Sequence, residues 1–142
     1  METFHWPVRV YYEDTDSGGV VYYANYLRFM ERARTEWLRS LGVEQDRLIE
    51  QEGVLFAVRH VDLDYLKPAR FNDQLEVTSR VIEHGRASLT FAQTITRMDA
   101  ETKTELCRGQ VKIACLGVES FRPRPIPEFL RTSLRMEKAS GY

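Results

Sequence analysis

The spacing of hydrophobic positions changes along the chain and separates an early helical part from a later strand-rich part. In the helical part, apolar residues recur every three or four positions, in a stripe made of Tyr26, Phe29, Met30, Ala33, Trp37 and Leu41. That spacing places them on one face of an α-helix. Gly42 follows the stripe and suits the position just after a helix C-terminus. The pattern predicts one long, half-buried helix that ends near Gly42.

From Val54 onward, apolar residues recur at every second position, which is the period of a β-strand. In the first such strand we expect one face to carry Leu55, Ala57, Val61, Leu63 and Tyr65, and the other to carry Phe56, Val58, His60, Asp62 and Asp64. Turn-forming residues at 72–73, 84–85 and 98–103 divide the rest into further strands. A short strand is also expected near residues 8–12, and a short second helix over residues 44–52.

One early helix followed by three or four long strands with short turns indicates an α+β fold. In such a fold an antiparallel sheet curls around the helix. The 142 residues suffice for one domain with a sizeable core, and no repeat, low-complexity tract or linker divides them. We therefore expect a single domain covering residues 1–142.

Composition and charge limit the classes of function. The formal net charge is −1, so bulk electrostatics favours neither nucleic acid nor an anionic membrane as a partner. No apolar run approaches the ~20 residues that span a bilayer, and the N-terminus lacks the layout of a signal peptide. Cys107 and Cys115 fall in one strand, too far apart along it to pair. Reduced thiols and a cytoplasmic location are expected.

Two aspartates and a glycine pair precede the long helix, in the segment Asp14-Thr15-Asp16-Ser17-Gly18-Gly19. The free backbone N–H groups and the dipole at a helix N-terminus stabilise developing negative charge. The oxygen of a thioester or other acyl group placed there would be polarised, while Asp16 activates water or attacks the carbonyl carbon. The alternative for Asp16 is a helix-capping or turn-forming role, which is common for aspartate.

Other candidate residues also have two explanations. The glycine pair either admits a ligand carbonyl close to the backbone, with Gly19 as the binding position, or only lets the turn reach positive φ. Arg86, after the turn at His84-Gly85, either binds a ligand phosphate or is an ordinary surface arginine. The three alternating polar residues His60, Asp62 and Asp64 have metal-ligand chemistry, but a solvated strand face explains them better. The motifs of zinc proteases, P-loops, Rossmann folds and serine hydrolases are missing from the sequence.

Several segments carry a resemblance to a known family: residues 12–26, which read Tyr-Glu-Asp-Thr-Asp-Ser-Gly-Gly-Val-Val-Tyr-Tyr-Ala-Asn-Tyr, and residues 29–36, 65–73 and 123–127. Together they closely resemble the YbgC-type acyl-CoA thioesterases. These proteins belong to the hot-dog-fold superfamily and to the 4-hydroxybenzoyl-CoA thioesterase family. Within that superfamily the resemblance is to members associated with the Tol-Pal envelope system.

The resemblance implies a hot-dog fold, with a curved antiparallel sheet wrapped around one long helix, and a homodimer or homotetramer with its sites at the dimer interface. The implied reaction is hydrolysis of the thioester of an acyl-CoA or an acyl carrier protein, without a metal or redox cofactor. Coenzyme A enters only as part of the substrate. The implied catalytic carboxylate is Asp16, the oxyanion-polarising N–H belongs to Tyr23, and Tyr12 supports the site. Arg86 corresponds to basic residues near the coenzyme A nucleotide.

Tyr23 departs from the pattern, because many YbgC-type proteins carry a histidine there. A tyrosine, with a reference pKa of ~10, is not a base at neutral pH. The 4-hydroxybenzoyl-CoA branch carries an aromatic residue at this position and relies on its backbone N–H.

Two other functions stay open: a non-catalytic module that binds acyl-CoA or acyl carrier protein, and a hot-dog dehydratase. The dehydratase normally needs a histidine near the helix, and the motif contains none.

Overall fold

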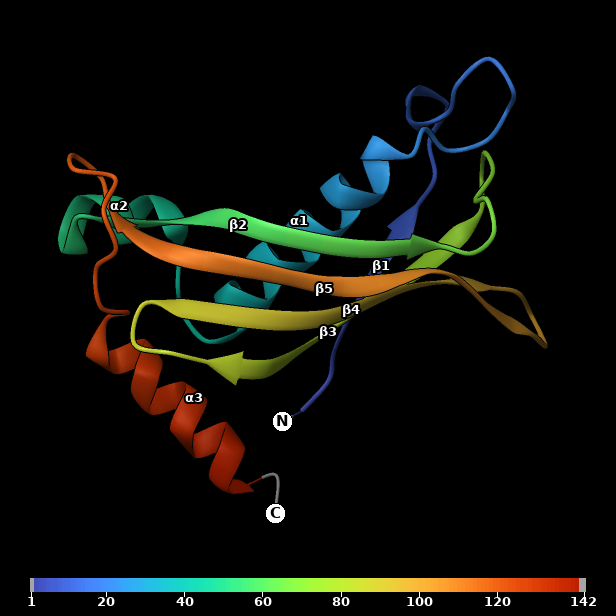
Figure 1. Cartoon of the computed structure of the whole chain (residues 1–142). Helices are drawn as coiled ribbons and strands as arrows, with labels where there is room; N and C mark the ends of the chain where they lie inside the picture. Colours follow the sequence, from blue (N-terminus) through green and yellow to red (C-terminus); the bar gives the residue numbers. More distant parts are fainter. Residues whose placement is uncertain (1, 141–142) are drawn as a thin grey trace.

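The computed structural model describes residues 2–140, with side chains described as far as residue 134 (Figure 1). In this part of the chain one antiparallel sheet has the strand order β1-β3-β4-β5-β2. Its strands are β1 (Phe4–Arg9), β2 (Val54–Tyr65), β3 (Gln74–His84), β4 (Ser88–Met98) and β5 (Lys103–Gly117). The helices are α1 (Ala24–Ser40), α2 (Gln45–Glu52) and α3 (Glu128–Ser140), and a 3₁₀ turn, η1, covers Tyr12–Asp14. The expected α+β fold, a curved sheet around one long helix, is confirmed.

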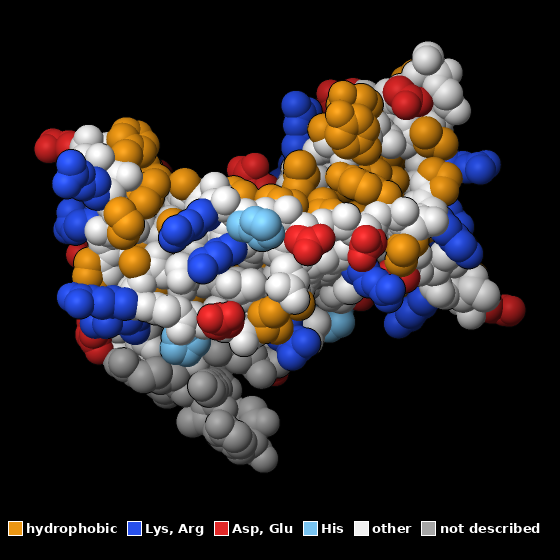
Figure 2. All heavy atoms as spheres, viewed as in Figure 1, with side chains coloured by type: hydrophobic (Ala, Val, Ile, Leu, Met, Phe, Trp, Pro, Cys, Tyr) orange, Lys and Arg blue, Asp and Glu red, His pale blue; other side chains and the backbone are white. Residues whose placement is uncertain are grey.

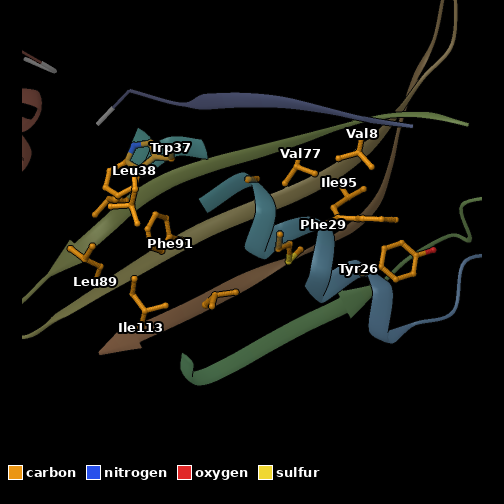
Figure 3. Close-up of a cluster of buried hydrophobic side chains, with 14 of the residues drawn as sticks. Val8, Tyr26, Phe29, Trp37, Leu38, Val77, Leu89, Phe91, Ile95 and Ile113 are labelled. Atoms are coloured by element: carbon orange, nitrogen blue, oxygen red, sulfur yellow. The ribbon is translucent and has the colours of Figure 1, made fainter. Parts of the chain in front are cut away.

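Helix α1 packs its predicted stripe against one face of the sheet. Figure 3 shows Tyr26, Phe29 and Trp37 of α1 lying against strand side chains in the core. The ring of Trp37 meets that of Phe91 edge-on, with centroids 5.2 Å apart. The end of the helix is also as predicted: Gly42 has φ +83°, and the N–H of Val43 donates to the carbonyl of Leu38 at 2.9 Å. This arrangement is a Schellman cap.

Strand β2 departs from the predicted alternation of its faces. Its pairing with β5 shifts register between Val58 and His60, so Arg59 forms a β-bulge. One extra residue moves every later side chain of the strand to the opposite face of the sheet. The core-facing side of β2 therefore carries Phe56 and Val58 before the bulge, and Val61, Leu63 and Tyr65 after it. The prediction that Leu55 and Ala57 share a face with Val61 is wrong, because they lie on the outer face with His60, Asp62 and Asp64.

The first strand starts earlier than its apolar pattern suggested. Residues Phe4 to Arg9 pair with Ser79 to Gln74 of β3. Tyr12, which was expected in the strand, lies in η1 instead. Pairing with β3 therefore decides the extent of this strand, since its own alternation is apparent only from Val8.

The outer face of the sheet is polar. His60, Asp62 and Asp64 are exposed on it, as predicted. Figure 2 looks onto this face and shows side chains of both charges scattered over β2 and β5. Among the described residues no group of three or more His, Cys, Asp and Glu is placed to hold a metal ion.

Cys107 and Cys115 are buried and unpaired. Within residues 2–140, no helix has the length and apolarity needed to cross a membrane.

Candidate functional site

Asp16 lies in a tight turn that is held by its own backbone and side chain. Thr15 and Val21 form an antiparallel bridge, and the N–H of Asp16 donates to the carbonyl of Val20 at 2.9 Å. The N–H of Gly18 donates to Oδ1 of Asp16 at 2.8 Å. Asp16 is therefore a turn-forming aspartate. Its other oxygen, Oδ2, has no hydrogen-bond partner among the described side chains and backbone, and the residue is exposed. One oxygen orients the carboxylate and the second stays available for chemistry.

Asp14 connects this turn to the helix. Its side chain accepts the N–H of Tyr11 at 2.8 Å. Its carbonyl accepts the N–H of Tyr22 at 3.1 Å and the side-chain N–H of Asn25 at 2.8 Å. The expected turn role of Asp14 is thus what the structure has. Asn25, which sequence reasoning overlooked, is a buried amide in the first turn of α1 that holds the acidic loop against the helix.

The start of α1 presents unused backbone donors. The N–H groups of Asn25 and Tyr26 donate to the carbonyls of Tyr22 and Tyr23, at 2.8 and 3.3 Å. The N–H groups of Tyr23 and Ala24 have no acceptor within the described part of the chain, and the first turn carries no acidic residue. These two donors stand at the positive end of the helix dipole, where an oxyanion would be stabilised.

The loop between β2 and β3 forms a wall beside the acidic turn. The N–H of Val21 donates to the carbonyl of Ala69 at 2.8 Å, and Val20 forms a bridge with Arg70. The N–H of Ala69 donates in turn to the hydroxyl of Tyr26 at 2.9 Å. Two segments that are more than forty residues apart in sequence, and that both carry the family resemblance, are therefore side by side.

Aromatic rings surround the start of α1. The ring centroids of Tyr22 and Tyr23 are 4.7 Å apart, those of Tyr23 and Tyr65 are 6.3 Å apart, and those of Tyr65 and Tyr26 are 5.4 Å apart. The hydroxyl of Tyr65 donates to the carbonyl of Tyr23 at 3.4 Å. Figure 2 shows hydrophobic side chains gathered around this end of α1. Sequence reasoning missed Tyr65 because its own strand gives no sign of a contact with the helix.

These phenols are not bases at neutral pH. A side-chain hydrogen bond with Tyr23 raises the pKa of Tyr22. Burial raises the pKa of Tyr26 and of Tyr65. A phenol whose pKa lies above its usual ~10 keeps its proton. Tyr22, Tyr26 and Tyr65 are therefore unsuited to remove a proton at neutral pH.

The remaining predicted residues are distributed over two ends of the molecule. Tyr12 is exposed near the acidic turn, with its ring against Phe71 at 5.3 Å between centroids. Gly19 has φ +78° with open space around the position of a side chain, so the turn itself requires glycine there. Arg86 is exposed in the β3–β4 hairpin, at the end of the sheet opposite to the start of α1 (Figure 1). An eleven-residue strand separates these ends by about 35 Å, so one chain does not bring Arg86 to Asp16.

A cationic depression lies closer to the acidic turn. It has a volume of about 470 Å³ and is lined by Lys67, Pro68, Arg70, Asp73, Arg97 and Asp99. Arg97 is paired with Asp73 and Asp99 at 3.5 and 3.6 Å. Lys67 and Arg70 are exposed and have no ion-pair partner among the described side chains. Two free cations beside the turn are suited to phosphate groups.

Comparison with known proteins points to one family. The family model described as "Thioesterase-like superfamily" matches residues 10–134. The acyl-CoA thioesterase YbgC of Haemophilus influenzae is 41% identical over 92% of this chain and 93% of its own length. The acyl-CoA thioester hydrolase YbgC of Escherichia coli is 45% identical over 88% and 90%. A crystal structure of a 1,4-dihydroxy-2-naphthoyl-CoA thioesterase from Synechocystis superposes with a TM-score of 0.85 at 26% identity, covering 94% of this chain and 96% of that one.

Proposed function

The chain belongs to the thioesterase-like superfamily, and on that premise we propose that Asp16 and the start of α1 carry out the hydrolysis of an acyl-coenzyme A. The expected kinship with the YbgC-type thioesterases is confirmed, and the chain is an enzyme of this thioesterase class. The observation that carries the proposed site is the loop of Asp16. It presents a free carboxylate oxygen and is hydrogen-bonded to a helix start whose N–H groups of Tyr23 and Ala24 are unused.

In the proposed reaction the thioester carbonyl oxygen accepts hydrogen bonds from the N–H of Tyr23, with Ala24 adjacent. Asp16 removes a proton from water as the water oxygen attacks the carbonyl carbon. The negative charge on the tetrahedral oxyanion is stabilised by the backbone donors and the helix dipole. The C–S bond then breaks, Asp16 returns the proton to the thiolate, and the carboxylic acid and free coenzyme A leave. This assignment explains how the site works with a tyrosine at position 23, because only its backbone N–H takes part.

The second mechanism has Asp16 as the nucleophile. Its carboxylate attacks the carbonyl carbon, the thiolate leaves, and water hydrolyses the resulting mixed anhydride. A single turnover in ¹⁸O-labelled water supports the anhydride if label enters Asp16, whereas attack of water at the acyl carbon of an anhydride leaves Asp16 unlabelled. Attack of water on an anhydride at the carboxyl carbon of Asp16 places ¹⁸O in that side chain, which mass spectrometry of the Asp16 peptide detects. Direct attack of water on the thioester leaves the peptide unlabelled.

The substitution Asp16→Asn tests the catalytic role. An asparagine Oδ1 still accepts the N–H of Gly18, so the turn is expected to persist. Losing the base or nucleophile should lower kcat by about 10²–10⁴-fold. The matched control is Asp14→Asn, which changes a carboxylate bonded to Tyr11 in the same loop and should keep activity within a few-fold. The assay is thiol release across acyl-CoAs from short to long and aromatic, and from an acyl carrier protein.

Wild-type rates for Asp16→Asn would refute this mechanism. Failure of the wild-type protein to release thiol from any of these thioesters, with binding retained, would instead favour the non-catalytic acyl-CoA-binding module.

A cytoplasmic location is part of the proposal, supported by the two buried, unpaired thiols.

We also propose that the enzyme is a homodimer joined along β2. This strand is an edge of the sheet, twelve residues long, and Figure 1 shows nothing beyond it in the sheet. Long, uncovered edges tend to pair with another strand. Val58, on the core face of β2, is 53% exposed, and Tyr65 is 48% exposed. A second copy paired there would cover both.

Symmetry gives Arg86 a place in this dimer. Two antiparallel β2 strands related by a two-fold axis bring the Val54 end of one copy beside the Tyr65 end of the other. Arg86 lies at the Val54 end of its chain, since the hairpin residue Ala87 bonds to Cys115 and β5 pairs Cys115 with Phe56. Arg86 of one copy would therefore approach the Asp16 site of the other. The rival phosphate site is the pair of free cations Lys67 and Arg70 on the same chain as Asp16.

Mixing two inactive variants decides between these arrangements. Asp16→Asn is mixed with Arg86→Glu, and subunits are exchanged under mild denaturant. If Asp16 works with Arg86 of the other copy, each mixed dimer contains one intact site, and activity should reach about a quarter of the wild-type value. If both residues act within one chain, or if Lys67 and Arg70 bind the phosphates, the mixture does not exceed the sum of its parents. A monomer by sedimentation would contradict the dimer itself.

A further inference from the structure

Asn25 joins the first turn of α1 to the acidic loop. The residue is 7% exposed, and its Nδ2 donates to the carbonyl of Asp14 at 2.8 Å. The same carbonyl accepts the N–H of Tyr22 at 3.1 Å, so two donors converge on one oxygen. Because a carbonyl oxygen only accepts hydrogen bonds, the side chain at position 25 must present a donor there. An amide does so at any pH, whereas a carboxyl group does so only when it is protonated.

The turn that carries Asp16 is otherwise bonded within itself. The N–H of Asp16 donates to the carbonyl of Val20 at 2.9 Å, and its carbonyl accepts the N–H of Gly19 at 3.0 Å. Its Oδ1 accepts the N–H of Gly18 at 2.8 Å. These bonds fix the shape of the turn but not its direction relative to α1. Among the side chains of α1 that the structure describes, Asn25 is the one that donates to the acidic loop.

The β2–β3 loop holds the far end of the same turn. The N–H of Val21 donates to the carbonyl of Ala69 at 2.8 Å, and the N–H of Ala69 donates to the hydroxyl of Tyr26 at 2.9 Å. Tyr26 follows Asn25 on α1, so two neighbouring helix residues hold the two ends of the turn. These four residues are at most 7% exposed in their own chain. All the bonds join residues of one chain, and none of them depends on a second copy.

We propose that Asn25 is a positioning residue, which sets the place of the Asp16 carboxylate relative to the N–H groups of Tyr23 and Ala24. The inference rests on the proposed hydrolysis, in which the carboxylate and these donors act on one thioester group. Misplacement of such groups by about 1 Å can slow a reaction about 10²-fold. The hydrogen bond of Asn25 controls this spacing, because it begins on the helix that carries the donors and ends two residues before Asp16.

Thiol release by variants at position 25 tests the proposal. Asn25→Ala removes the donor and should lower kcat by about 10²-fold. KM should change by less than about threefold, because Asn25 does not touch the substrate. Added to Asp16→Asn, the same change should slow the reaction by less than about threefold further, since no catalytic carboxylate is left to position.

Asn25→Asp adds a pH dependence that a purely structural role does not predict. The ionised carboxylate would face the carbonyl of Asp14 without a donor, whereas the protonated carboxyl group would donate its O–H to it. The kcat of this variant, divided by that of the wild type at the same pH, should therefore rise at least about tenfold as the pH falls from about 9 to about 5. The variant keeps the size of the side chain and carries the test if Asn25→Ala does not fold.

Ser79→Ala is the matched control for the loss of a buried hydrogen bond. Ser79 is fully buried, and its hydroxyl accepts from Nε2 of Gln93 at 2.8 Å. Gln93 in turn accepts from Nη1 of the buried Arg34 at 2.9 Å, away from the acidic loop. Ser79→Ala should be less stable in chemical denaturation, yet keep its kcat within about threefold of the wild type.

Four results would overturn the proposal. Wild-type kcat in folded Asn25→Ala, with Asp16→Asn slowed as expected, would refute the positioning role and leave the proposed hydrolysis standing. Additive losses in the double variant would show that Asn25 acts independently of Asp16. An Asn25→Asp to wild-type ratio that stays constant with pH would show that the donated hydrogen bond has no effect on the rate. No thiol release by the wild type would remove the proposed hydrolysis, and this inference with it.

Discussion

Gly109 of β5 lies where the next strand passes unusually close. A Cβ added to Gly109 would stand 2.0 Å from the carbonyl oxygen of Asp62 and 2.8 Å from Cα of Leu63. These are backbone atoms of β2, so no side chain can rotate away. The oxygen contact falls short of an ordinary 3.4 Å by roughly 1.4 Å, and a close-packed interior does not absorb that without moving the strand. We predict that Gly109→Ala forces β2 away from β5.

The size of the effect follows from two contributions. Overpacking of this kind costs about 1–3 kcal/mol, and each ladder hydrogen bond that is lost removes about 1 kcal/mol net. Together they predict a loss of about 3 kcal/mol in the free energy of unfolding, or a fall in Tm of about 6–12 °C. Activity should fall as well, because Tyr65, two residues beyond Leu63, contacts the start of α1 through Tyr23.

Chemical denaturation and thiol release on the same preparations measure both effects. The matched control is Gly85→Ala, whose added methyl would meet only the movable hydroxyl of Ser88 at 3.1 Å. This change should stay within about 0.5–1 kcal/mol. If Gly109→Ala loses less than about 1 kcal/mol with an unchanged denaturant slope, the close approach of β2 to β5 at Gly109 is wrong.

Three further predictions concern the frame of the site. Burial raises the pKa of Cys107 from 9.0 to about 11, so the unfolded chain gives up this proton first and stability should fall between pH 9 and 11. Over this pH range the wild type should lose about 2–3 kcal/mol more of its free energy of unfolding than Cys107→Ala does. Urea titrations measure this loss, and the same pH dependence in both proteins would refute the prediction. Gly42→Ala should lose about 1 kcal/mol in the same titrations, because φ is +83° there; no loss would argue against the Schellman cap. Deleting Arg59 should abolish the native near-ultraviolet circular dichroism, whereas Arg59→Ala should keep it; a native spectrum for the deletion would contradict the bulge.

The parts of the fold that sequence alone predicted are those fixed by local spacing. The stripe of α1 and its end at Gly42 depend on residues within one turn of each other. The faces of β2 could not be predicted, because the bulge at Arg59 exists only relative to β5. Arg34 is an intermediate case. It falls on the buried stripe, four residues after Met30 and three before Trp37, and that position was a usable signal of a buried charge.

The candidate site shows the same division. Asp16 and the helix start could be proposed together because they are close in sequence. The turn-forming role of Asp16 leaves room for the catalytic prediction, since the turn uses only Oδ1. Tyr65 and Asn25 were missed because their contacts depend on how β2 and the acidic loop fold onto α1. The role of Arg86 near the coenzyme A nucleotide was taken from the family resemblance. It assigns Arg86 to a site that, within one chain, lies at the other end of the sheet.

The exposure of the site gives the proposed dimer a consequence for catalysis. Tyr23 is 61% exposed, so in a lone chain water reaches the backbone donors at the start of α1. An oxyanion is stabilised far less by such donors in water than in a dry, low-dielectric site. A second copy along β2 would cover Tyr65 and Val58 and exclude water from this end of the helix. Specific activity should therefore follow the fraction of dimer as the protein is diluted. Constant specific activity through the dissociation range would mean that one chain suffices.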